Sequence, residues 1–223
     1  MERRHVIGGA LGLTLVGAAL GSATGPAVPS GGHDHRLTSR TPEERRRSRF
    51  PSLLLRTHED QEVRLYEDLL KDKTLLINFM YTACTDECPL TTANLVQVQR
   101  LLTPRVGRAL SLCSISVDPV HDTPAVLAAY AKTFRVQPGW TFLTGRREDI
   151  LRLRRHFGDN PALDFSQSQH LNMLTYGIEP LERWGGCPTL ANPQWIARYL
   201  SWLDPQGERP TGWWPPGHGL PGA

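Results

Sequence analysis

The sequence predicts one α/β domain of three layers, with a mostly parallel central sheet, an N-terminal hairpin and flanking helices. Two continuous apolar runs of strand length, residues 74–81 and 110–117, are typical of strands buried on both faces. A segment with helical features follows each run, which is the order expected of a parallel sheet. With 223 residues and 39% hydrophobic composition, the chain can form one sizeable core and still leave terminal extensions.

The predicted elements alternate along the chain. Residues 52–56 and 62–66 are expected to form a hairpin. A helix should follow Pro89, because proline is tolerated in the first helical turn. Thr123 suits the N-cap and Pro124 the first position of a helix that runs to residue 134. Later strands are predicted at 141–144 and 170–176, and later helices at 147–157 and 192–203.

Residues 1–23 are predicted to be an export signal. Arg3 and Arg4 precede an uncharged apolar stretch of about 15 residues, which is shorter than a membrane-spanning helix needs. Cleavage is therefore favoured over a permanent anchor, which stays open as the alternative and would be the chain's one contact with a membrane. The adjacent arginines fit the twin-arginine route and an ordinary signal equally well.

The remaining chain divides by composition. Residues 24–50 are rich in Gly, Pro, Ser and charge and predict a flexible linker, whereas 51–204 form the folded domain. Residues 205–223 predict an irregular Pro/Gly-rich tail. A net charge of +3, from 25 basic and 22 acidic residues, is too slight and too scattered to indicate a nucleic-acid-binding surface, and no nucleic-acid partner is expected. Four cysteines are too few for a disulfide-stapled scaffold, so we expect some of them to carry chemistry in the periplasm or at the extracytoplasmic face of the membrane.

Cys84 and Cys88 are the most informative residues. They follow a predicted buried strand and lead into a helix, which places both thiols at the carboxyl edge of the sheet, where open α/β folds bind ligands. A helix amino terminus favours the thiolate, the form that attacks disulfides and binds metals. Three intervening residues allow either a disulfide or a grip on one ion, and soft sulfur ligands suit copper(I). Two thiolates do not complete a site, so a third ligand is expected.

Four pieces of the sequence resemble the Sco (SenC/PrrC) proteins, a family of exported or membrane-associated copper chaperones. These pieces are residues 79–89, residues 114–119 with 122–124, residues 139–145, and His170. The resemblance implies a thioredoxin-like fold. It also implies one copper ion per domain, held by Cys84, Cys88 and His170, and delivery to the dinuclear copper centre of cytochrome c oxidase. The implied partners are the copper-accepting oxidase subunit, a copper donor and a thiol reductant.

The sequence departs from the family pattern at two places. The family usually has an acidic residue before the histidine, whereas Gln169 and Leu171 flank His170 here. Glu87 stands at a position that is commonly apolar. A carboxylate there is expected to raise a thiol pKa or to shift the metal preference.

An enzyme of the thiol-disulfide oxidoreductase class is the main alternative. In it, Cys84 or Cys88 would attack a disulfide of the target protein, and His170 would tune the thiol pKa. A peroxidase is a weaker enzymatic alternative. A scaffold without metal would make both thiols incidental, which two close cysteines in an oxidising compartment argue against.

Other candidate residues have simpler interpretations. Cys113 lies in a predicted central strand and should pack in the core. Cys187 is placed in a loop, as a spare thiol, a resolving cysteine or a partner of Cys113. His33 and His35 belong to the solvated linker. His121 is the runner-up metal ligand.

Polar residues near the predicted site and on the basic helix also have structural interpretations. Asp118 and Asp122 are expected to organise their loop through hydrogen bonds, because hard carboxylates bind copper(I) poorly. His156 should face water. Arg152, Arg154 and Arg155 are expected to form a solvated face.

Overall fold

The computed structural model describes residues 40–102, 106–107, 110–158 and 173–203. The predicted export signal, the C-terminal tail, His33, His35 and His170 lie outside these residues. Within the described ranges, no helix combines the length and apolar character that crossing a bilayer requires.

A sheet of seven strands organises the described residues, in the order β2-β1-β5-β4-β3-β6-β7. The three central strands are parallel, since β4 pairs in parallel with both β3 and β5. The other pairs are antiparallel: the hairpins β1–β2 and β6–β7 form the two edges of the sheet, and β1 and β6 pair antiparallel with β5 and β3. The strands are β1 (Leu54–Thr57), β2 (Glu62–Arg64), β3 (Thr74–Met80), β4 (Leu110–Ser116), β5 (Trp140–Gly145), β6 (Met173–Ile178) and β7 (Arg183–Pro188).

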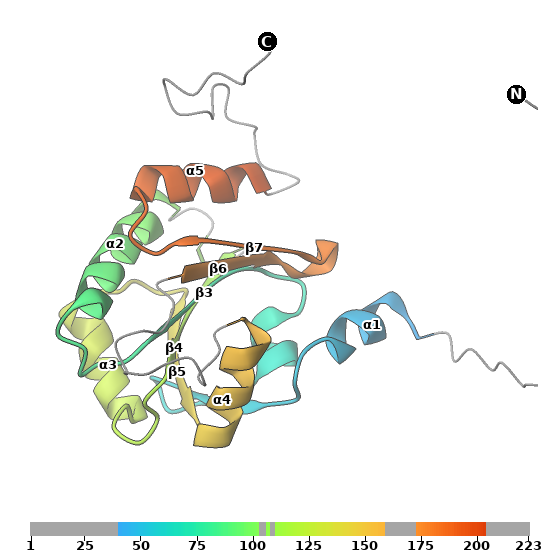
Figure 1. Ribbon diagram of the computed structural model, residues 1–223, viewed down its shortest axis with the longest axis horizontal. Helices are drawn as coiled ribbons and strands as arrows, with labels where there is room; N and C mark the ends of the chain where they lie inside the picture. Colours follow the sequence, from blue (N-terminus) through green and yellow to red (C-terminus); the bar gives the residue numbers. More distant parts are fainter. Residues whose placement is uncertain (1–39, 103–105, 108–109, 159–172, 204–223) are drawn as a thin grey trace, which may run out of the picture. The chain divides into compact units, whose positions relative to one another are not determined.

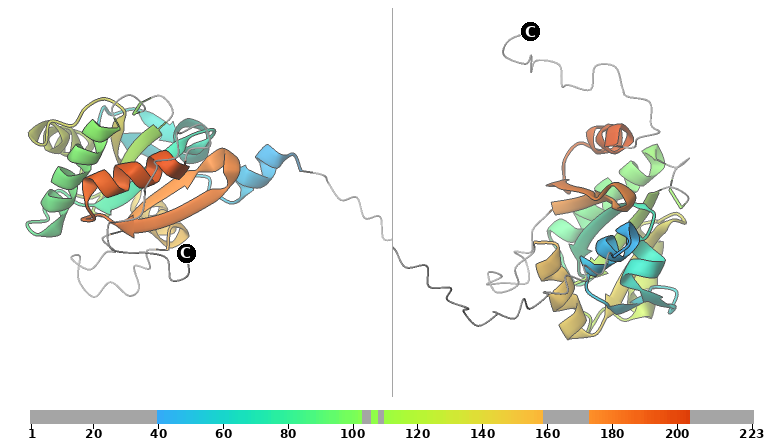
Figure 2. Two further views of the ribbon diagram at one scale, coloured as in Figure 1. Left: turned by 90° about the horizontal axis from the view of Figure 1, so that it is seen from above. Right: turned by 90° about the vertical axis from the view of Figure 1, so that its right-hand side faces the viewer.

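Helices cover both faces of this sheet, which confirms the predicted three-layer α/β architecture (Figure 1). Side chains from α2, α3 and α5 share one buried cluster, and side chains from α4 and η1 share a second. Helix α5 runs along β6 and β7 (Figure 2). The helices are α1 (Pro42–Ser48), η1 (Leu65–Leu70), α2 (Glu87–Leu101), α3 (Pro124–Thr133), α4 (Arg147–His156), η4 (Glu179–Leu181) and α5 (Pro193–Leu203).

Local sequence signals explain where several helices begin. Thr123 caps α3 by accepting a hydrogen bond from the Val126 N–H, and Pro124 occupies the first turn, as predicted. Thr41 and Glu44 form a reciprocal capping box at the start of α1. Helix α2 begins without a side-chain cap, so its first N–H groups remain available to other acceptors.

The last part of the predicted linker differs from the prediction. Residues 42–48 form α1, and Phe50 is buried in the second cluster. The anchor is Glu179, a carboxylate only 1% exposed, which accepts hydrogen bonds from Arg46 Nε at 2.8 Å and from the Tyr66 hydroxyl at 2.7 Å. Composition did not reveal this helix, because its partner lies more than 130 positions away in the sequence.

Two further predictions were wrong. Cys187 lies in strand β7 and not in a loop, because its backbone pairs with that of Leu174 across the β6–β7 hairpin. Its side chain is buried. Two glycines precede Cys187, and they concealed the strand pattern. Arg154 is buried, whereas Arg152 and Arg155 are exposed as predicted.

Candidate metal centre

The cysteine loop, residues 81–88, joins the carboxyl end of β3 to the first turn of α2. Cys84 lies within the loop and Cys88 is the second residue of α2. Both side chains are buried, at 8% and 4% exposure, although Ala83 and Thr85 beside Cys84 are exposed. The two thiols therefore lie just beneath the surface, at the edge of the sheet where the sequence predicted them.

The helix amino terminus stabilises the Cys84 thiolate. Burial raises the pKa of Cys84, but hydrogen bonds from the backbone of Cys88 and Asp86 outweigh that effect, and the pKa falls below its ordinary value. The Cys88 N–H donates to Cys84 Sγ at 3.4 Å. Cys84 is thus the thiol that more readily becomes an anion.

Cys88 has the opposite character. Burial raises its pKa to about 12, and the negative charges of Cys84 and Glu87 add to the increase. The expectation that Glu87 raises a thiol pKa agrees with this assignment. The pair therefore combines a buried thiol that ionises more readily than an ordinary cysteine with a second thiol that stays protonated until a metal ion displaces its proton.

Asp122 holds the cysteine loop against the connection between β4 and α3. Its carboxylate is 1% exposed and accepts hydrogen bonds from the Thr82 N–H at 3.1 Å and from Ser116 Oγ at 2.5 Å. The Thr82 hydroxyl donates to the same carboxylate. The backbone carbonyl of Asp118 accepts a hydrogen bond from the Asp122 N–H at 3.0 Å. Both aspartates organise the loop, as predicted, but the sequence did not identify Thr82 as the partner.

Tyr130 is a neighbour of the thiols that the sequence analysis missed. Its hydroxyl lies 2.9 Å from Thr92 Oγ1, one turn along α2 from Cys88, and Thr92 also donates to the Cys88 carbonyl. Burial raises the pKa of Tyr130 to about 12, with smaller contributions from the charges of Cys88 and Cys84. A single tyrosine on a helical segment carries no local signal that would have indicated this position.

The structure does not test the third predicted ligand, since His170 lies outside the described residues. The runner-up, His121, is exposed, and its Nδ1 lies 2.8 Å from Asp118 Oδ2. In the parts of the chain that the structure describes, no three His, Cys, Asp or Glu side chains gather closely enough to hold an ion. The described donor set is therefore the thiol pair, whose soft sulfur atoms fit copper(I).

The other two cysteines are not part of this site. Cys113 is buried on the opposite sheet face, where burial raises its pKa to about 12, so its predicted role in core packing is confirmed. Cys187 belongs to the same buried cluster as Cys84 and Cys88, and burial raises its pKa to about 11. Both are free thiols in separate clusters, which excludes the disulfide between Cys113 and Cys187 that the sequence left open.

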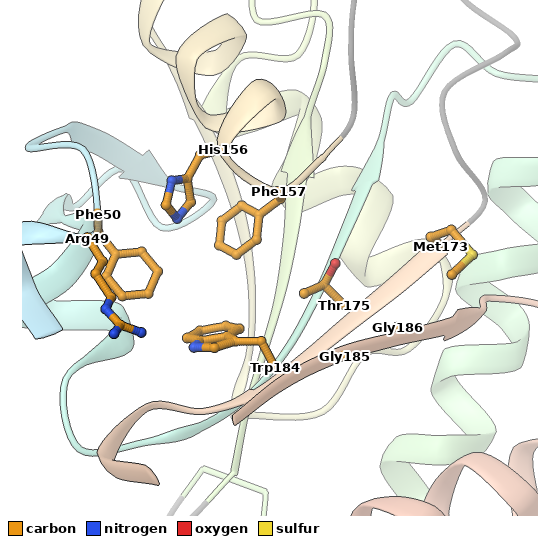
Figure 3. A pocket seen from close by; sticks show the side chains of 9 residues that line it. All are labelled: Arg49, Phe50, His156, Phe157, Met173, Thr175, Trp184, Gly185 and Gly186. Atoms are coloured by element: carbon orange, nitrogen blue, oxygen red, sulfur yellow. The ribbon is translucent and has the colours of Figure 1, made fainter. Parts of the chain in front are cut away.

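Figure 3 shows a separate pocket of about 520 Å³. Its aromatic side chains belong to or pack against the second buried cluster, on the sheet face opposite the thiol pair. The rings of Phe50, Phe157 and Trp184 line the pocket, and Phe50 and Trp184 have ring centroids 5.4 Å apart. His156 is exposed, as predicted. Its ring centroid nevertheless lies 5.0 Å from that of Phe50, and the partial burial of the imidazole lowers its pKa. Arg49 at the rim forms an ion pair with Glu182 at 2.9 Å.

Comparison with known proteins adds a family match to this geometry. Residues 52–169 match the family model SCO1/SenC. A SCO2-like protein of Rickettsia felis is 35% identical over 83 residues, which are 37% of this chain and 39% of that protein. The chain spans about half, or less, of the length of the curated relatives that it matches.

Solved structures share the fold. The copper-bound structure of Bradyrhizobium japonicum ScoI is 24% identical, covers 67% of this chain and 96% of that chain, and has a TM-score of 0.56. The structure of BsSco, described as a member of the Sco family of cytochrome c oxidase assembly proteins, is 23% identical in sequence. The match covers 67% of this chain and 90% of that chain, with a TM-score of 0.56. These likenesses support the thioredoxin-like architecture that the sequence predicted.

Proposed function

This chain belongs to the SCO1/SenC family, and we propose that it binds one copper ion through Cys84 and Cys88 and delivers it to an assembling respiratory oxidase. One observation carries the proposal: a thiol pair with unequal pKa values, buried at the amino terminus of α2 beneath an exposed loop. Such a pair provides two soft ligands without a closed tetrahedral cage, which suits the low coordination that copper(I) accepts.

His170 is the third ligand in this proposal. Thiolate and imidazole together form a set that can hold copper(I) or copper(II). The family resemblance supports the assignment, and the absence of an acidic neighbour at position 169 leaves the imidazole to be oriented by other groups. The copper-bound ScoI structure supports copper as the cargo.

The unequal thiols suggest how copper is taken up and released. Cys84 offers its thiolate first, and binding of the ion then displaces the proton of Cys88, so that uptake releases a proton. Because the site stays under-coordinated, an acceptor ligand can join the ion before a donor ligand leaves. Returning a proton to Cys88 favours release, since its thiol form is the stable one in this buried position. The acceptor is an oxidase subunit, and uptake requires a copper donor and a reductant that keeps both thiols reduced.

The family match and the predicted signal at residues 1–23 support an extracytoplasmic location for this transfer.

The same asymmetry favours a second candidate function, thiol-disulfide exchange. A thiolate with a lowered pKa attacks disulfides, and a nearby buried thiol resolves the mixed disulfide. In this function Cys84 is the attacking thiolate and Cys88 the resolving thiol. Two electrons pass from the dithiol to the target disulfide, which is reduced while Cys84 and Cys88 become a disulfide.

An anaerobic copper(I) titration against a competing chelator separates the two functions. The reduced wild-type chain should bind one equivalent tightly, and Cys84→Ser, Cys88→Ser and His170→Ala should each lose that binding. Cys113→Ser is the matched control, since its thiol lies on the other sheet face and should leave copper binding unchanged. Wild-type binding no tighter than that of the cysteine variants contradicts the copper proposal, and the reduction potential of the pair then becomes the decisive quantity.

A further inference from the structure

The surface around the cysteine loop, which we call the cysteine face, combines exposed apolar side chains with carboxylates. Its apolar members include Leu90 at 58% exposure, Val120 at 64% and Leu190 at 47%. Its carboxylates include the exposed Asp86 and the half-buried Glu87, both within the loop itself. Single exposed apolar residues are ordinary, but here Leu90 follows Cys88 by two residues, and Val120 and Leu190 stand on segments that hydrogen bonds join to the cysteine loop or to α2.

Hydrogen bonds hold the three segments of the cysteine face together. Asp122 joins the cysteine loop to the connection that carries Val120, through the Thr82 N–H. Thr91 Oγ1 donates to Thr189 Oγ1 at 3.1 Å, and Asn94 donates to the Thr189 carbonyl at 2.8 Å. These bonds place Leu190, the next residue, beside the first turns of α2. The face is thus one connected surface.

The charge of the cysteine face differs from that of the rest of the chain. The segments that carry the cysteine loop, Val120 and Leu190, which are residues 81–95, 117–130 and 187–191, contain no Lys or Arg, although the whole chain has 25. They contain four acidic residues, of which only Asp122 is fully buried. By contrast, α1 carries three arginines and α4 carries four. Helix α4 lies on the opposite side of the sheet from α2 and α3 (Figure 1).

We propose that the cysteine face docks a partner protein whose surface presents an apolar patch edged by lysine or arginine side chains. This inference rests on the proposed function, because the partner must bring a ligand close to the thiol pair. The exposed leucine and valine side chains exclude water at the contact, while the carboxylates attract a basic surface and repel an acidic one. Opposite charge also speeds the encounter, by tenfold or more at low ionic strength.

Two synthetic peptides of equal length test this chemistry. Both carry the same two methionine ligands and the same leucines. In one peptide lysines flank these residues, and in the other glutamates do. Each is titrated into the full, reduced, copper-free chain while the backbone resonances are followed. The lysine peptide should bind about tenfold more tightly at low salt, shift the resonances of residues 86–90 and 189–191, and lose its advantage as salt is added.

Matched variants locate the effect. Asp86→Lys should abolish the preference for the lysine peptide; its side chain makes no capping hydrogen bond, and circular dichroism checks that the variant keeps its fold. Glu148→Lys makes the same charge change at an exposed position of α4, on the opposite sheet face, and should leave the preference intact. Leu190→Glu should weaken binding of the lysine peptide, whereas Leu181→Glu, at 42% exposure outside the face, should not.

Two outcomes overturn the inference: equal affinity of the chain for both peptides, or equal effects of the face variants and their controls. Neither outcome depends on copper, because the chain is titrated copper-free. Failure of the copper(I) titration with intact discrimination between the peptides would contradict the proposed function alone. The two ideas therefore fail separately.

Discussion

Two buried carboxylates join distant parts of the chain, one beneath the cysteine loop and one beneath α1. Asp122 and Glu179 are each 1% exposed, and each accepts a backbone N–H, from Thr82 in one case and from Asp72 in the other. Glu179 also pairs with Arg46, whereas the described partners of Asp122 are N–H and O–H groups only. The α1 junction is thus a salt bridge, and the junction at the cysteine loop is not.

The absence of a basic residue among the described partners of Asp122 suits the proposed copper site, because the cysteine loop is held in place without a competing cation. A guanidinium beside Asp122 would also attract the Cys84 thiolate and repel an incoming copper ion. Hydroxyl and amide donors stabilise the carboxylate without that conflict. At the α1 junction no such constraint applies, so Arg46 can neutralise Glu179 directly. We therefore expect both carboxylates to stabilise the fold, but only Asp122 to affect copper binding.

Removing Glu179 should have the largest effect on stability. Glu179→Ala leaves the buried Tyr66 hydroxyl and the Asp72 N–H without their acceptor and breaks the pair with Arg46, and we expect a loss of about 3–5 kcal/mol in the free energy of unfolding. Copper(I) affinity should stay unchanged. Denaturant unfolding measures the first quantity and chelator competition the second. Glu182→Ala, which breaks only the exposed pair with Arg49, should cost less than about 1 kcal/mol. Equal losses of unfolding free energy in Glu179→Ala and Glu182→Ala would contradict the idea that burial makes the Glu179 carboxylate the more important one.

Removing Asp122 should affect both properties. Asp122→Ala leaves the Thr82 N–H and the Ser116 hydroxyl unpaired, which should cost about 2–3 kcal/mol. Because the cysteine loop is then less well positioned, copper(I) affinity should fall about 10–100-fold. Denaturant unfolding and chelator competition again measure the two effects. Asp122→Asn, which keeps an oxygen acceptor, should recover part of the stability and part of the copper affinity. A copper affinity equal to that of wild type would show that Asp122 does not position the loop.

The pH dependence of alkylation compares the cysteine face with the opposite sheet face. A thiol reacts as its thiolate, whose fraction rises as the pH rises through the pKa. The pKa of Cys84 lies below its ordinary value and those of Cys88 and Cys113 are about 12. At pH 8 iodoacetamide should therefore modify Cys84 more than about tenfold faster than the other two. Mass spectrometry of the modified peptides checks this, and comparable rates for Cys84 and Cys88 would contradict the assigned asymmetry.

Local patterns predicted most of the fold. The apolar runs correctly predicted β3 and β4, and the Thr123–Pro124 pair correctly predicted the start of α3, because strand burial and helix capping depend on neighbouring residues. The thiol pair was predicted at the carboxyl end of a strand for the same reason. Its asymmetry was predicted only in part, through Glu87.

Contacts between distant residues decided the rest. Neighbouring residues were enough to predict the alternation of the central strands and helices, the family resemblance and the position of Cys84 and Cys88 between β3 and α2. The pairing of Thr82 with Asp122, the docking of α1 through Glu179 and the burial of Cys187 in β7 came from the folded chain. The physical reason is range: propensity and periodicity act over a few residues, whereas these contacts depend on how whole strands and helices pack.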